Sequence, residues 1–103
     1  MIDDVSVELA RVVDRLRSMP LARLSRPSGE HSSLAEGARA LAQRLADQAV
    51  NIGGWPRHEV PDVGDAAVGD QVAVTGRDLL GLSPGDDVLA GAAADMRAFR
   101  LSM

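Results

Sequence analysis

Three side chains that could bind a metal ion or transfer a proton lie close together in one predicted loop: His58, Glu59 and Asp62. Zinc sites need three or four ligands at defined spacing, and the other histidine, His31, belongs to a different predicted loop. The chain has no cysteine, which excludes disulfides, thiolate chemistry and cysteine-bound zinc. We therefore interpret the cluster as a solvated polar loop, and we expect no metal, no cofactor and no catalytic residue.

Acidic residues are the second place where chemistry could occur. The 15 aspartates and glutamates will form some close pairs by chance, whereas acid-base catalysis also needs a pocket and a perturbed pKa. The helix dipole accounts for Asp86 and Asp87, which stand at a predicted helix start. The sequence has no nucleophile elbow, phosphate-binding glycine loop or dinucleotide fingerprint. A small enzyme, or an enzyme's accessory subunit, that uses His58 and nearby carboxylates remains an alternative hypothesis.

The single tryptophan, Trp55, stands between glycines and prolines in the segment NIGGWPRHEVPDVG. Such a residue either folds onto the end of the protein as a plug or stays exposed as an anchor for a partner. The plug is the simpler interpretation, and the anchor is the more specific functional one. On the anchor interpretation, Trp55, Arg57 and His58 are the candidate partner-binding residues.

Four segments have the spacing of amphipathic helices, and we predict an all-α, four-helix bundle-like fold in a single domain over residues 1–103. Their apolar residues recur at steps of three and four. Ser33 and Glu36 form a capping box, in which the glutamate side chain returns to the cap amide, and Ser83 with Pro84 marks another helix start. The predicted ranges are 3–18, 33–51, 65–81 and 84–101. The first two have the clearest apolar seams, so we expect them to pack against each other.

The polar face of the first helix is expected to carry Glu8, paired with Arg11 one turn away. Residues 20–32 break the helical spacing with prolines, a glycine and serines, which predicts a flexible linker with some order near Leu21 and Leu24.

Residues 65–82 allow two interpretations. As a helix, the segment has Val68, Val72 and Leu79 on one stripe, with the small residues Gly69, Ala73 and Gly76 along one flank, where another helix could approach closely. As a strand, residues 71–75 alternate and would give an α+β fold. We favour the helix, since no other segment supplies a convincing partner strand.

Charge and composition limit the classes of function. The formal net charge of −4 disfavours non-specific binding to nucleic acid or to an anionic membrane. No signal peptide or membrane-spanning stretch is recognised, so we expect a cytoplasmic protein. The leading hypothesis is a non-enzymatic helical interaction module that binds a protein partner or itself, as a homodimer. The alternative is a small transcriptional regulator or antitoxin-like protein with an arginine-bearing N-terminal region.

One family resemblance rests on the chain length and on the mid-chain turn Gly53-Gly54-Trp55-Pro56-Arg57. In these features the chain resembles the WXG100 proteins that type VII secretion exports, although the glycines here precede the tryptophan. The resemblance implies a helical hairpin with Trp55 in its turn, and a secretion-associated role.

Overall fold

The computed structural model describes residues 2–103, and apart from one isolated bridge between Ser28 and His31 its regular structure is helical. The elements are α1 (Ile2–Ser18), α2 (Leu21–Leu24), α3 (Leu34–Gly53), the 3₁₀ helix η1 (Asp65–Ala67), α4 (Val68–Gly81) and α5 (Asp86–Ser102). The predicted all-α fold is confirmed, and the four long helices match the four predicted ranges closely. The strand alternative for residues 71–75 is wrong, because that whole segment lies in α4.

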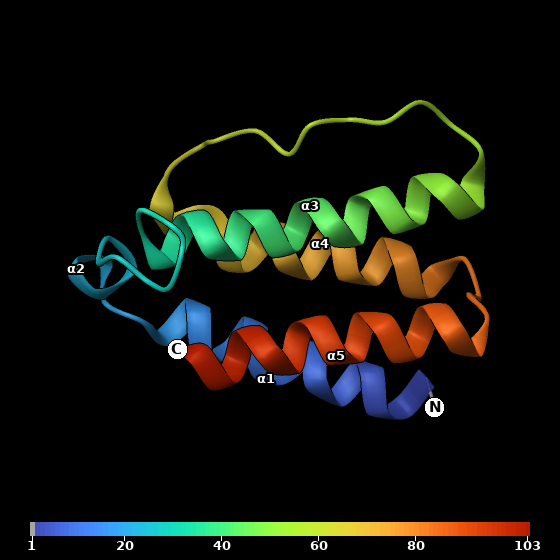
Figure 1. Ribbon diagram of the computed structural model, residues 1–103, viewed down its shortest axis with the longest axis horizontal. Coiled ribbons are helices and arrows are strands. Elements are labelled where there is room, and N and C mark those ends of the chain that lie inside the picture. The colour runs from blue at the N-terminus through green and yellow to red at the C-terminus, as the bar shows by residue number, and fades with distance from the viewer. Residues whose placement is uncertain (1) are drawn as a thin grey trace.

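The four long helices form a bundle in which α1 and α5 run one way and α3 and α4 run the other (Figure 1). Helix α1 packs against α4 and α5, and α3 packs against the same two helices. The expectation that α1 and α3 pack against each other is therefore wrong, because they lie at opposite corners of the bundle. An apolar stripe shows that a helix is buried on one side, but it does not show which helix covers it.

The parallel direction of α3 and α4 explains the long segment between them. Helix α3 has 20 residues and is about 30 Å long at 1.5 Å per residue, so the chain must return along its whole length. Residues 54–64 make this return as an extended crossover loop over the bundle (Figure 1). A segment of this length reaches about 36 Å when extended. The helical hairpin implied by the WXG100 resemblance is not formed, since Trp55 begins a crossover instead.

The core is aliphatic, and its largest fully buried side chains come from all four long helices. The predicted close approach of another helix to the small residues on one flank of α4 is confirmed, and the approaching helix is α1. A Cβ atom added at Gly76 would lie 2.6 Å from Leu9 Cδ1, and one added at Gly69 would lie 3.1 Å from Arg17 Cγ. Glycine at these two positions therefore lets α1 and α4 meet closely.

The helix ends agree only partly with the predicted caps. Ser33 Oγ accepts a hydrogen bond of 3.0 Å from the Glu36 amide, as a cap should, but the Glu36 carboxylate accepts from Ser32 Oγ instead of returning to the cap amide. Ser83 does not cap α5: it has a φ of 52°, and the N-cap residue is Gly85.

The segment predicted as a linker contains α2, which corresponds to the expected order near Leu21 and Leu24. Beyond α2, the Leu34 amide donates a 2.8 Å hydrogen bond to the carbonyl of Arg26. The flexibility of this segment stays a prediction.

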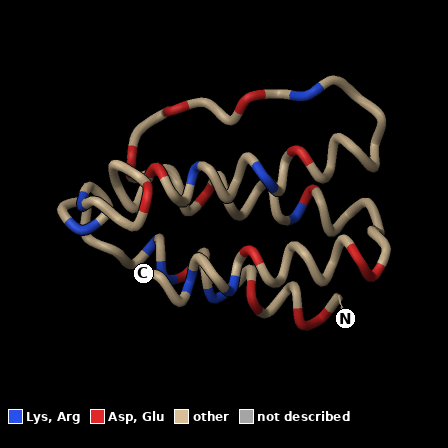
Figure 2. The backbone as a smooth tube through the Cα atoms, in the orientation of Figure 1, with Lys and Arg blue, Asp and Glu red and all other residues tan. Residues whose placement is uncertain are grey.

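Charged residues are separated along the α1–α5 pair. Both helices begin with aspartates and carry arginines toward their ends, and because they run parallel these charges gather at opposite ends of the bundle (Figure 2). Each set of charges offsets the dipoles of α1 and α5 at that end.

Glu8 is the exception to the predicted polar face of α1. Only 8% of it is exposed, and Arg100 of α5 donates a hydrogen bond to it while Arg11 lies 3.8 Å away. No helix between residues 2 and 103 combines the length and apolar character needed to cross a bilayer.

Candidate functional site

The crossover loop is fixed to the bundle by two glutamines whose side chains bond its backbone. On α3, Gln43 donates to the carbonyl of His58 at 3.0 Å and accepts from the amide of Val60 at 2.7 Å. On α4, Gln71 donates to the carbonyl of Pro61 at 2.7 Å. An extended loop satisfies its backbone poorly by itself, so these bonds explain why the loop follows a defined path.

Two ion pairs add to this attachment. Arg57 Nε lies 2.9 Å from Asp47 Oδ1 on α3, and Asp62 lies 3.1 Å from the guanidinium of Arg39 on the same helix. Asp62 also accepts a hydrogen bond from the Gly64 amide. Within the described residues no group of three or more histidines, aspartates and glutamates could hold a metal ion.

An apolar groove of about 470 Å³ lies between the second half of this loop and α4. Its walls include Val60, Pro61 and Val63 from the loop, Ala46 from α3 and Val74 from α4. Val63 is 62% exposed and Val74 is 56% exposed, although both are large aliphatic residues. We call this surface the crossover groove.

One residue that lines the crossover groove has an unsatisfied polar atom. Gln71 lines the groove, and the side-chain carbonyl oxygen of this residue is buried without a hydrogen-bond partner in the part of the chain that the structure describes. A buried acceptor without a donor costs free energy.

The structure brings two of the three residues predicted to bind a partner, Trp55 and His58, to one cavity and leaves Arg57 outside it. The Trp55 ring lies over Gly53, where an added Cβ would come within 1.6 Å of it, and the residue remains 42% exposed. Trp55 and His58 share a cavity of about 170 Å³, and His58 also lines the crossover groove. Arg57 lines neither and instead pairs with Asp47. Trp55 therefore lies next to the crossover groove without lining it, because the cavity that it shares with His58 adjoins the groove.

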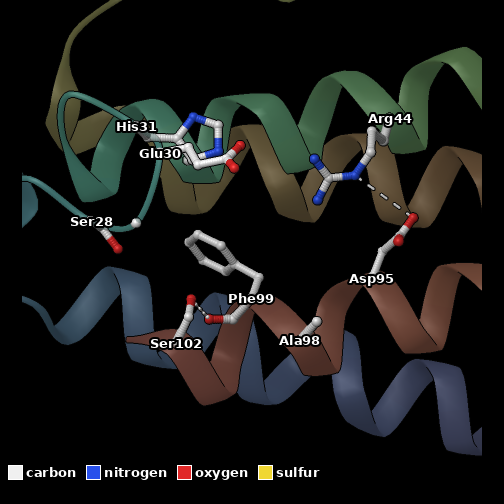
Figure 3. Close-up of a pocket in the computed structure, with 10 residues that line it drawn as sticks. Ser28, Glu30, His31, Arg44, Asp95, Ala98, Phe99 and Ser102 are labelled. Atoms are coloured by element: carbon white, nitrogen blue, oxygen red, sulfur yellow. Dashed lines mark hydrogen bonds and ion pairs between the residues drawn. The ribbon is translucent and has the colours of Figure 1, made fainter.

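A second concave surface, which the sequence did not indicate, separates α3 from α5. This cleft has a volume of about 500 Å³ and is lined by residues of three segments: the turn 28–31, α3 and α5. Figure 3 shows Phe99 between the two helices, with His31 and Glu30 above it and the Arg44–Asp95 pair farther along. We call this surface the α3–α5 cleft.

Local structure explains the position of the two rings in the α3–α5 cleft. Ser28 and His31 exchange backbone hydrogen bonds of 3.2 and 3.0 Å around Gly29, whose φ of 57° favours glycine, and this tight turn directs His31 toward α3. A Cβ at Gly37 would lie 3.2 Å from His31 Cδ2 and 3.3 Å from Phe99 Cε1. Both rings therefore fill the space that a side chain at Gly37 would need.

No protein-family model, curated protein or solved structure matches this chain.

Proposed function

We propose that this protein is a non-enzymatic interaction module that self-associates, and that the crossover groove is its contact surface. The observation that carries the proposal is the exposure of Val63 and Val74 on the two sides of an apolar groove. Single exposed aliphatic residues are ordinary, but large ones grouped around a concave surface are typical of binding sites.

A neighbouring residue supports this proposal. Trp55 lines the cavity next to the groove and is 42% exposed, and aromatic residues with one exposed side are frequent anchors at interfaces.

Two of the five arginines in residues 1–27 are paired with carboxylates, which weakens the alternative of nucleic-acid binding. Arg17 forms an ion pair of 2.7 Å with Asp70, and Arg11 lies 3.8 Å from Glu8. Arginines paired in this way add less to the positive field that attracts phosphates. We therefore propose a protein, in the form of a second copy, as the partner.

The test is light scattering after size-exclusion chromatography over a range of concentrations. We expect a concentration-dependent dimer for the wild type, and we expect Val74→Asp to shift it to monomer by burying a charge in the interface. Val7→Asp is the matched control, because Val7 is 49% exposed on α1 and does not line the groove. Both variants should keep the wild-type circular dichroism spectrum, since both positions are exposed.

A wild-type protein that stays monomeric at every concentration would contradict self-association. A dimer that Val7→Asp disrupts as strongly as Val74→Asp would contradict the assignment to the crossover groove.

A further inference from the structure

The α3–α5 cleft has an arginine at one end, and next to it a glutamate that lies above an aromatic ring (Figure 3). At one end, Arg44 Nε lies 3.7 Å from Asp95 Oδ2, which is too long for a hydrogen bond. Figure 3 shows the two terminal nitrogens of Arg44 on the side of the cleft that faces Phe99. A guanidinium held in this way presents its planar pair of N–H donors to the cleft, and this is the geometry that binds a carboxylate.

The opposite charge lies farther along the cleft. Glu30 lines the cleft beside His31, and Figure 3 shows its carboxylate above the Phe99 ring, on the side toward Arg44. An ammonium group placed there would be attracted by the carboxylate.

The floor of the cleft suits a flat apolar group. The Phe99 ring is half-buried and Ala98 lies beside it, so an aromatic ring can stack there without displacing charged groups. The volume of about 500 Å³ lies within the range of small-molecule sites.

The balance of charge decides the class of ligand. The cleft holds one guanidinium, Arg44, and two carboxylates, Glu30 and Asp95. A simple anion would bind Arg44 but would meet two negative groups, and a simple cation would leave the donors of Arg44 unused. A molecule with both charges close together pairs with both Arg44 and Glu30.

We propose that the α3–α5 cleft binds a small zwitterion with an aromatic side chain, such as an aromatic α-amino acid. Its carboxylate lies on Arg44, its ammonium group near Glu30, and its ring against Phe99. This proposal does not depend on the crossover groove.

The test is a titration of the ¹⁵N-labelled protein followed by ¹H–¹⁵N correlation spectra. Four probes separate the three contacts: L-phenylalanine carries both charges and a ring, 3-phenylpropanoate lacks the ammonium, phenethylamine lacks the carboxylate, and glycine lacks the ring. We expect saturable shifts at the amides of Gly37 and Phe99, with L-phenylalanine binding about tenfold more tightly than each of the other probes.

Two variants assign the charged contacts. Arg44→Gln should reduce the affinity for L-phenylalanine to that for phenethylamine, and Glu30→Gln should reduce it to that for 3-phenylpropanoate. The control is Arg97→Gln, which removes an exposed arginine of α5 that does not line the cleft, and it should leave the affinity unchanged. All three side chains are exposed, so the fold should survive each change.

Two results would overturn the proposal. The first is the absence of saturable shifts with L-phenylalanine up to about 10 mM, a concentration that corresponds to very weak binding. The second is selectivity for L-phenylalanine that Arg44→Gln and Glu30→Gln leave unchanged, or that Arg97→Gln weakens equally.

Discussion

Two helix interfaces in this bundle both contain glycine, yet they differ in how closely the helices meet. At the α1–α4 interface, Leu9 lies directly over Gly76, and the groove left at the outer edge has a volume of about 250 Å³. At the α3–α5 interface, the space beside Gly37 is taken by the rings of His31 and Phe99, and a cleft of about 500 Å³ remains. A glycine on a helix face therefore permits close packing, and the group that lies opposite decides whether a helix or a ring uses the space.

The largest effect is expected from removing the side chain that closes the α1–α4 interface. Leu9→Ala should lower the free energy of unfolding by about 2–5 kcal/mol, because it leaves a cavity over Gly76 that the surrounding backbone cannot fill. Urea denaturation followed by circular dichroism measures this change. Val7→Ala, on the exposed side of α1, should stay within about 0.5 kcal/mol of the wild type. Equal losses for the two variants would show that Leu9 does not close the interface.

The opposite change, which adds volume to α4, should lower the free energy of unfolding by a smaller amount. Gly76→Val should lower the free energy of unfolding by about 1–3 kcal/mol, because the new methyl groups collide with Leu9. Gly81→Val in the same helix meets open space and serves as the control. Combining Gly76→Val with Leu9→Ala should cost at least about 0.5 kcal/mol less than the sum of the single changes, since one fills the cavity left by the other. Strict additivity would disprove this contact.

The ion pair across the α3–α5 cleft should contribute less to the free energy of unfolding than the one between α1 and α5. Asp95→Asn is expected to change the free energy of unfolding by less than about 1 kcal/mol, because Asp95 and Arg44 are 3.7 Å apart and both are partly exposed. Glu8→Gln should cost about 1–3 kcal/mol, since Glu8 is buried and Arg100 would lose its charged acceptor. Chemical denaturation of both variants in one buffer tests this order, and a reversed order would contradict it.

The smallest effect is expected for Gly37→Ala. The new methyl group would lie 3.2–3.3 Å from the His31 and Phe99 rings, which can move by a few tenths of an ångström into the cleft. Alanine also favours the helix by about 0.8–1.0 kcal/mol over glycine, so the net change in stability should stay within about 0.5 kcal/mol. The ring resonances of Phe99 should nevertheless shift in NMR spectra. A loss as large as that of Gly76→Val would mean that the cleft is as tightly packed as the α1–α4 interface.

Much of the fold could be predicted because the signals were local. The three-four apolar spacing located the four long helices within a few residues, and the small flank of α4 indicated a close helix contact. Local spacing does not show which helix makes this contact. The same limit applies to Glu8: its spacing to Arg11 predicted a surface pair, whereas the partner that buries it, Arg100, comes from the other end of the chain.

The candidate sites were less predictable for the same reason. Trp55, Arg57 and His58 are adjacent in sequence, but the extended loop turns Arg57 toward α3 and leaves only Trp55 and His58 around one cavity. The α3–α5 cleft combines His31, Arg44 and Phe99 from three separate segments, and no spacing in the sequence connects them. Gly37 could have indicated a close approach, but the apolar spacing of its helix is carried by leucines and does not single out a glycine.

Because of the crossover loop, the helices of each half of the chain pack against the helices of the other half. The N-terminal half contributes α1 and α3, and the C-terminal half contributes α4 and α5. Every extensive contact among the long helices joins a helix of one half to a helix of the other. If a protease cut the exposed backbone near Arg57, neither fragment could cover its own apolar stripes by pairing its two helices as they pair in the bundle. The two fragments would acquire their native structure only together, so the chain is built as a covalently linked pair of mutually dependent halves.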